Sequence, residues 1–209
     1  KRREELGLPP RKKNELNCTE YNLQEKTVSI GANGPPSATG MTDYRSHTFS
    51  FDHIFPPHVT NEDVYNSLCT PILNSAFNGI HGAVLCYGQT GAGKTHTMNG
   101  NDTSRGIIPR VVDSIFTHAL STEASVEFSI CCSYVEIYNE KIRDLLDIEK
   151  NNLNLRTSST EGRTDIIGST QIYVTSQDEM NEVMERGNNN RKVAATGEST
   201  ALIVCVGVR

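Results

Sequence analysis

Residues 83–98 read AVLCYGQTGAGKTHTM. The first five form a continuous apolar run, the pattern of a strand that is buried on both faces. They lead into the octet 88–95, GQTGAGKT, which matches the pattern G-x-x-x-x-G-K-[ST]. The residues from Lys94 onward are compatible with a helix. A strand, a glycine-rich loop and a helix in this order predict a phosphate-binding loop.

Each residue type in the octet has a chemical reason to be there. Glycines let successive backbone N–H groups turn inward around phosphate oxygens, and the following helix adds its positive N-terminal end. Lys94 is expected to reach the β- and γ-phosphates, and the Thr95 hydroxyl is expected to bind Mg²⁺. An ordinary glycine-rich turn does not account for Lys-Thr at this offset. The predicted nucleotide-binding residues are Gly88, Gln89, Thr90, Gly91, Ala92, Gly93, Lys94 and Thr95.

Two common classes of phosphate-binding-loop protein fit the sequence poorly. GTPases read guanine with N-K-x-D, which residues 139–141 (Asn-Glu-Lys) do not supply. Small-molecule kinases usually carry the loop directly after their first strand, whereas more than 80 residues precede it here. The classes of phosphate-binding-loop protein that remain are ATPases and motors.

Composition narrows the class of protein further. The chain has 209 residues, a net charge of −5, 36% hydrophobic and 22% charged residues, which is typical of one folded domain. It is acidic overall and has no Trp, so a domain directed wholly at nucleic acid is not expected. Basic residues cluster within 1–13, which is interpreted as a solvated loop or as a contact for an anionic partner. The longest apolar run, 201–206, is far below the ~20 residues of a membrane helix.

The cysteine and histidine patterns predict neither a disulfide framework nor a metal centre. The six cysteines include no C-x-x-C pair, and the histidines lack ligand spacing. Most of the cysteines lie in apolar stretches, where a reduced thiol behaves as a small hydrophobic group. A cytoplasmic location is therefore expected.

Alternating strands and helices predict an α/β layered fold. The capping boxes Thr60/Asp63 and Ser176/Glu179 each open a helix, and Pro71 should kink the first of them. In the helix that starts at Pro109, Val112, Ile115, Phe116 and Leu120 form the predicted buried stripe. Strands are predicted at 27–30, 48–51 (half-buried), 83–87, 126–138, 153–156, 171–174 and 201–208. Helices are predicted at 61–78, from 94, 109–120, 140–146 and 176–188, with loops at 31–46 and 188–197.

Beyond the loop, the sequence resembles the kinesin motor domain. Residues 83–98 resemble its phosphate-binding segment, and residues 51–55 (FDHIF) with Val64-Tyr65 resemble the strand and helix before it. Residues 106–110 (GIIPR) and 133–147 (SYVEIYNEKIRDLLD) resemble two further blocks. Residues 189–196 (NNRKVAAT) resemble the approach to switch I. The resemblance covers residues 47–197, between a variable segment at 1–46 and a shortened switch I and strand or tail at 198–209.

This resemblance implies an ATP-driven microtubule motor: a P-loop NTPase with a central, mostly β sheet flanked by helices. ATP and Mg²⁺ would be held by residues 88–95, with His96 near the nucleotide. Arg156 and Arg163 flank a segment that resembles a tubulin-facing loop, although both are equally well interpreted as solvated charges. The implied location is on cytoplasmic microtubules, and dimers would form through segments outside these 209 residues.

Three kinesin motifs are absent from the sequence. The chain begins at Lys1-Arg2-Arg3, without the R-x-R-P that ends the family's first strand. Neither the N-x-x-S-S-R-S-H of switch I nor the D-x-x-G-x-E of switch II is present. Residues 165–168 (DIIG) follow a polar stretch and precede the switch I position, so they are not expected to be switch II. We therefore expect an incomplete motor domain, with no catalytic residue assigned.

Three interpretations remain open. The sequence is part of an active motor ATPase; it is a module that binds nucleotide or protein without turnover; or it is a truncated product that folds poorly because a central strand is missing.

Overall fold

The computed structural model describes residues 19–31, 47–123, 126–158, 164–194 and 201–208. The chain divides into two compact units, Lys1–Val59 and Thr60–Arg209. Within the first unit, β1 (Thr19–Asn22), β2 (Thr27–Ile30) and β3 (His47–Ser50) form an antiparallel sheet. The predicted strands at 27–30 and 48–51 are thus confirmed. The expected half-burial of the second is wrong, because every residue of β3 is exposed.

The second unit opens with one continuous helical segment. It comprises α2 (Asn61–Val64), the π-helical turn η1 (Tyr65–Cys69) and α3 (Thr70–Phe77). The predicted capping box is present: the Thr60 hydroxyl accepts the Asp63 N–H, and the Asp63 carboxylate accepts the Thr60 N–H. Pro71 has no N–H and its ring would crowd the carbonyl four residues earlier, and the wider π turn lies directly before it. The predicted disturbance at Pro71 therefore takes the form of a π turn.

After the glycine-rich loop come α4 (Lys94–Met98), a ladder of β4 (Gly100–Asn101) with β5 (Ser104–Arg105), and α5 (Ile107–Ser121). Val112, Ile115 and Phe116 of α5 are buried as predicted, but Leu120 is 87% exposed. At ~100° per residue, Leu120 lies about 80° around the helix from Val112, whereas Ala119 lies within about 20° of it. Ala119 accordingly packs against the core in its place.

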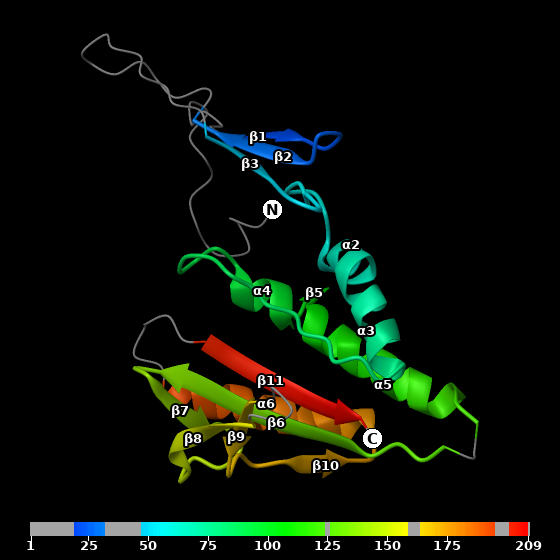
Figure 1. Cartoon of the computed structure of the whole chain (residues 1–209), viewed down its shortest axis with the longest axis vertical. Helices are drawn as coiled ribbons and strands as arrows, with labels where there is room; N and C mark the ends of the chain where they lie inside the picture. The colour runs from blue at the N-terminus through cyan, green and yellow to red at the C-terminus, as the bar shows by residue number, and fades with distance from the viewer. Residues whose placement is uncertain (1–18, 32–46, 124–125, 159–163, 195–200, 209) are drawn as a thin grey trace. The chain divides into compact units, whose positions relative to one another are not determined.

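A long central strand, β6 (Ile130–Tyr138), organises the six-stranded sheet. β11 (Ala201–Val208) pairs along its length, while β10 (Ile172–Val174) and β7 (Lys141–Asp144) pair with its opposite ends. β8 (Asn151–Thr157) and β9 (Thr164–Ile167) continue the sheet from β7. Every ladder among the described residues is antiparallel (Figure 1).

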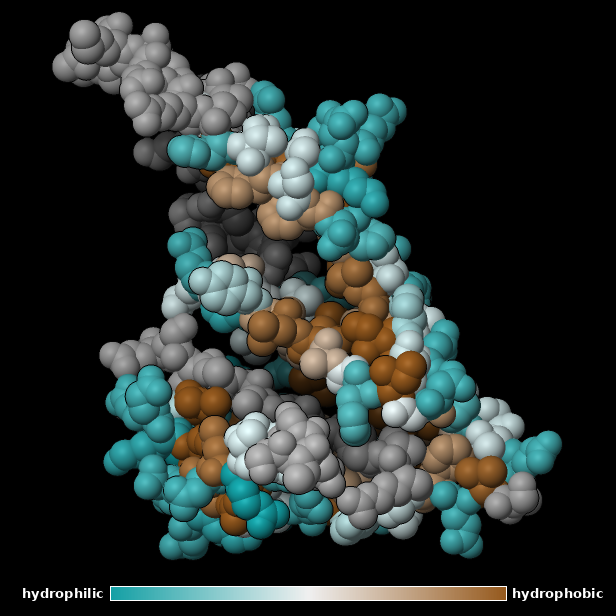
Figure 2. Space-filling model, viewed as in Figure 1, coloured by the Kyte–Doolittle hydropathy of each residue, from teal (hydrophilic) through white to brown (hydrophobic). Residues whose placement is uncertain are grey.

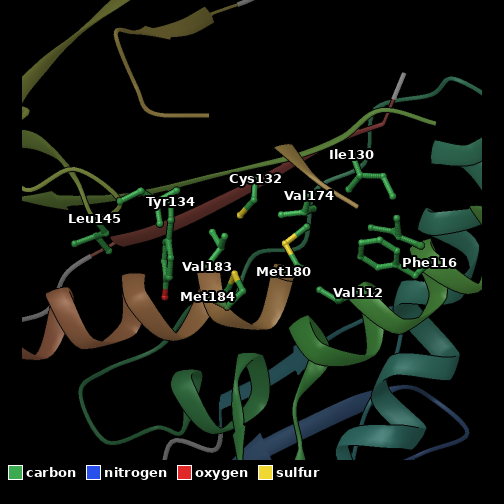
Figure 3. Close-up of a cluster of buried hydrophobic side chains, with 12 residues drawn as sticks. Val112, Phe116, Ile130, Cys132, Tyr134, Leu145, Val174, Met180, Val183 and Met184 are labelled. Atoms are coloured by element: carbon green, nitrogen blue, oxygen red, sulfur yellow. The ribbon is translucent and has the colours of Figure 1, made fainter. Parts of the chain in front are cut away.

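Helix α6 (Gln177–Ala194) and helix α5 pack against one face of this sheet (Figures 1 and 3). Alternate residues of β6 point toward them, because side chains on a strand alternate between its two faces. The resulting core contains Val112, Ile115, Phe116, Ile130, Cys132, Tyr134, Leu145, Leu146, Val174, Met180, Val183 and Met184.

Three sequence predictions about the elements from residue 126 onward are wrong. Residues 140–146, predicted as a helix, contain the strand β7, because Asn139 (φ 48°) and Glu140 (φ 60°) make a tight two-residue turn back from β6. Helix α6 continues to Ala194, through most of the loop predicted at 188–197. The strand predicted from residue 126 begins at Ile130.

Candidate nucleotide-binding site

The segment that enters the glycine-rich loop is extended but is not a ladder strand. Residues 80–88 have no strand assignment, so the strand predicted at 83–87 is wrong. Its side chains alternate: Val84 and Cys86 are half-buried, while Leu85 is 88% and Tyr87 98% exposed. Burial on both faces requires other elements to cover both faces of a strand. Here the Val84 side packs against the cluster of Tyr65, Cys69 and Ile107, while Leu85 and Tyr87 on the other side are exposed, and no described residue pairs with the segment.

The loop itself has the backbone that the motif predicts. Gly88 (φ 156°), Gly91 (φ 81°) and Gly93 (φ 96°) all occupy conformations that L side chains rarely adopt. One internal bond, from the Ala92 N–H to the Gln89 carbonyl at 3.1 Å, closes the turn. Successive glycines of this kind form a concave array of backbone amides, the geometry that receives anions.

Lys94 reaches back across its own loop. Its Nζ donates to the carbonyl oxygens of Gly88 (2.6 Å) and Gln89 (3.0 Å). The ammonium group has three donors, so a third remains for a phosphate oxygen. These bonds hold the positive charge of Lys94 against the carbonyls of its own loop.

Helix α4 begins at Lys94, as the sequence predicts, and is short. It spans only Lys94–Met98, too few residues for a substantial helix dipole. The attraction for an anion must therefore come from the loop amides and from the Lys94 ammonium, and less from the helix end than predicted. Thr95 is exposed in the first turn of α4, so its hydroxyl is available to solvent.

Two asparagines hold α4, and neither was singled out from the sequence. The buried Asn61, the first residue of α2, donates from Nδ2 to the His96 carbonyl at 3.0 Å. Asn99, directly after α4, donates from Nδ2 to Asn188 Oδ1 at 3.4 Å. The partners are 35 and 89 residues apart, so no local spacing could have revealed them.

The remaining candidate residues are less informative. The His96 side chain is half-buried, and nothing in the structure tests its predicted role beside the nucleotide. Arg156 is exposed on β8, while Arg163, residues 1–13 and the switch I position at 196–200 lie outside the described residues. Residues 165–167, the first three of the D-x-x-G match, lie within β9, an outer strand of an antiparallel hairpin.

Hydrophobic residues on the surface lie near the loop rather than in it. Ile80, Leu85 and Tyr87 are all exposed, and brown surface gathers over the α3–α4 region (Figure 2). A groove of about 310 Å³ lies between α3 and the segment entering the loop, and residues such as Ile72, Ile80 and His81 line it. It does not include residues 88–95.

The described residues hold neither a cluster of metal ligands nor a membrane-spanning helix. No group of three or more His, Cys, Asp or Glu residues there could hold a metal ion. Mg²⁺ in nucleotide sites is held by one or two protein oxygens together with phosphates, so a single Thr95 hydroxyl fits that chemistry. Within the same residues, no helix combines the length and the apolar character that crossing a membrane requires.

Comparison with known proteins gives one consistent family. The profile of the kinesin motor domain matches residues 8–201. The chain is 41% identical to the kinesin heavy chain of Drosophila melanogaster over 179 residues, which is 84% of this chain and 17% of that protein. It is 37% identical to kinesin-related protein 3 of Dictyostelium discoideum over 157 residues, which is 72% of this chain and 13% of that protein.

A solved structure of a fast kinesin superimposes with a TM-score of 0.76 at 32% identity, covering 90% of this chain and 53% of that one. The chain thus spans less than a fifth of the length of the curated relatives named above and about half of the solved motor structure. The fold is that of the kinesin-type P-loop NTPases, as the sequence resemblance predicts. The chain belongs to the kinesin motor-domain family.

Proposed function

We propose that residues 88–95 bind the phosphates of ATP together with Mg²⁺, and that the chain is the nucleotide-binding part of a microtubule motor. The observation that carries the proposal is the Lys94 ammonium, held 2.6 Å from the Gly88 carbonyl at the mouth of a loop with three positive-φ glycines. The loop amide N–H groups would donate hydrogen bonds to phosphate oxygens, Lys94 would contact the terminal phosphates, and the Thr95 hydroxyl would hold Mg²⁺. When bound, Mg²⁺ neutralises charge that develops on the phosphates.

For these 209 residues alone, we propose binding without appreciable turnover. Phosphoryl transfer depends on residues that orient water and stabilise charge around the γ-phosphate. The sequence contains neither of the family's switch motifs. Microtubule binding and a cytoskeletal location follow from the family, and the exposed Arg156 of β8 is the described residue that we propose to face tubulin.

The test is the affinity of the chain for a fluorescent ATP analogue in the presence of Mg²⁺. Lys94→Ala removes a charge-assisted contact of about 1.5–3 kcal/mol, so affinity should fall by roughly 10- to 100-fold. Lys141→Ala, which removes an exposed lysine of β7, is the matched control and should change affinity by less than about twofold. Equal affinities of the Lys94→Ala variant and the wild type would reject the assignment of the loop. Phosphate release stimulated by microtubules would reject the proposal of binding without turnover.

A further inference from the structure

A polar cluster joins the end of α4 to β6 and α6. At its centre is Asn188 Oδ1, which accepts a hydrogen bond from the Tyr134 hydroxyl at 2.6 Å and one from Asn99 Nδ2 at 3.4 Å. Tyr134 is fully buried on β6, and Asn188 lies on α6 (Figure 3 shows Tyr134 beside this helix). One amide oxygen therefore connects three elements.

Tyr134 fixes the position of that oxygen. Its ring lies directly against the α6 backbone, since a Cβ at Gly187 would come within 2.0 Å of the ring. Its hydroxyl also takes a hydrogen bond from Arg191, one turn along α6. Burial raises the pKa of Tyr134, so the hydroxyl remains a proton donor to Asn188. Asn188 is thus positioned by the sheet and not by α4.

Asn99 connects α4 to the Asn188 side chain. It caps the C-terminus of α4, and its backbone N–H donates to the Thr95 carbonyl at 2.8 Å. Its Oδ1 is buried without a partner among the described residues, so the bond from Nδ2 to Asn188 is the contact that orients the amide. The five residues of α4 span only about 7.5 Å, so a displacement at Asn99 is passed to Lys94 and Thr95.

We infer that Asn188 is a positioning residue for the phosphate-binding loop, holding α4 through Asn99 while Tyr134 holds Asn188. This inference rests on the proposed function, because it concerns how the loop is held for a phosphate ligand. The hydrogen bond from α4 reaches Asn188 through Asn99, so Asn188 acts through the helix that carries Lys94 and Thr95.

Two isosteric substitutions separate this role from general damage. Asn188→Asp keeps an acceptor for both Tyr134 and Asn99, whereas Asn99→Asp replaces the donor with an oxygen facing Asn188 Oδ1. Each adds one negative charge, so the general repulsion of a nucleotide is similar. The probe is a fluorescent Mg-ADP analogue, and thermal melting reports stability separately. Asn99→Asp should weaken binding about fivefold or more, and Asn188→Asp should stay within about twofold of the wild type.

Equal losses in the two variants, or no loss in Asn99→Asp, would overturn the inference. If Asn99→Asp is unfolded at the working temperature, Asn99→Ala removes the donor more mildly and carries the same expected loss and the same criterion. Wild-type chain that fails to bind Mg-ADP would overturn the proposed function and this inference together. Wild-type binding that is sensitive to Lys94→Ala but not to Asn99→Asp would overturn the inference alone.

Discussion

Position 187 requires glycine because there is no room for a side chain there. Its Cβ would come within 2.0 Å of Tyr134 Cδ1 and 2.4 Å of Cε1, contacts that no side chain tolerates without movement. Helix propensity favours Gly→Ala by about 1 kcal/mol. Overpacking a core costs about 1–3 kcal/mol. After the gain in helix propensity is subtracted, Gly187→Ala should lower the free energy of unfolding by up to about 2 kcal/mol.

Urea unfolding measures this effect, with Glu185→Ala as the control on an exposed position of the same helix. The control should stay within about 0.5 kcal/mol of the wild type. A Gly187→Ala variant that is as stable as the wild type would show that Tyr134 does not lie against the α6 backbone.

The residues of the site differ in how far sequence alone could predict them. Lys94 and Thr95 follow from a motif, because the chemistry of phosphate binding fixes their offset from the glycines. Asn99 and Asn188 acquire their roles from a contact across 89 residues, and an isolated asparagine in a sequence carries no sign of its partner. Leu120 is more hydrophobic than Ala119, but the helical angle places Ala119 on the buried stripe, so hydrophobicity alone predicts the wrong residue.

At the scale of the elements, the turn between β6 and β7 allows a specific prediction about stability. Glu140 has φ 60°, a left-handed conformation that glycine adopts freely and β-branched residues resist. Glu140→Gly should therefore stabilise the chain by up to about 1 kcal/mol, and Glu140→Val should destabilise it by at least as much. The urea midpoints of the two variants should lie on opposite sides of the wild type. A shift of both in the same direction would argue against the two-residue turn.

The stability of the chain should depend on pH through Glu179, at the start of α6. Its pKa is lowered from the ordinary value of 4.5 because the carboxylate accepts hydrogen bonds from the Thr175 backbone N–H (2.7 Å) and hydroxyl (3.0 Å). A lowered folded-state pKa means that the stabilisation is fully present above pH 4.5 and is lost as pH falls through the lower value.

Glu179→Gln should therefore lower the urea midpoint at pH 6, and its difference from the wild type should shrink as the pH drops below 4.5. Glu185→Gln, at an exposed site on the same helix, provides the comparison. A difference between Glu179→Gln and wild type that is constant with pH would contradict the role of the charged carboxylate.

Local sequence patterns predict an element correctly where interactions between neighbouring residues determine its limits. The capping boxes at Thr60 and Ser176 mark real helix starts, since the Ser176 hydroxyl accepts the Glu179 N–H. The sequence predicts a helix at 140–146 because the positive φ of Asn139 and Glu140 has no strong sequence signature without glycine. Residues 83–87 have the composition of a strand, but a strand is defined by its neighbours, and no described residue pairs with them.

At the scale of the whole molecule, the order of elements was predictable but the pairing was not. β11 pairs with β6 across more than 60 residues, and each unit is compact by itself. This arrangement of strands and helices is the one found in the kinesin family. The chain covers 53% of a solved kinesin motor structure and keeps its fold over 90% of its own length. Residues 88–95, the proposed phosphate-binding loop, lie within residues 8–201, which the kinesin profile matches.

The most direct test of the account is therefore to ask which amides respond to nucleotide. Glycine-selective ¹⁵N labelling gives amide signals from up to 16 glycines, and Mg-ADP is titrated into the labelled chain. The account predicts that the signals of Gly88, Gly91 and Gly93 move most, because their backbone lines the phosphate site. Glycines in other elements, such as Gly168 after β9, should move little. Saturable shifts that leave Gly88, Gly91 and Gly93 unchanged, or no shifts at all, would contradict the central claim.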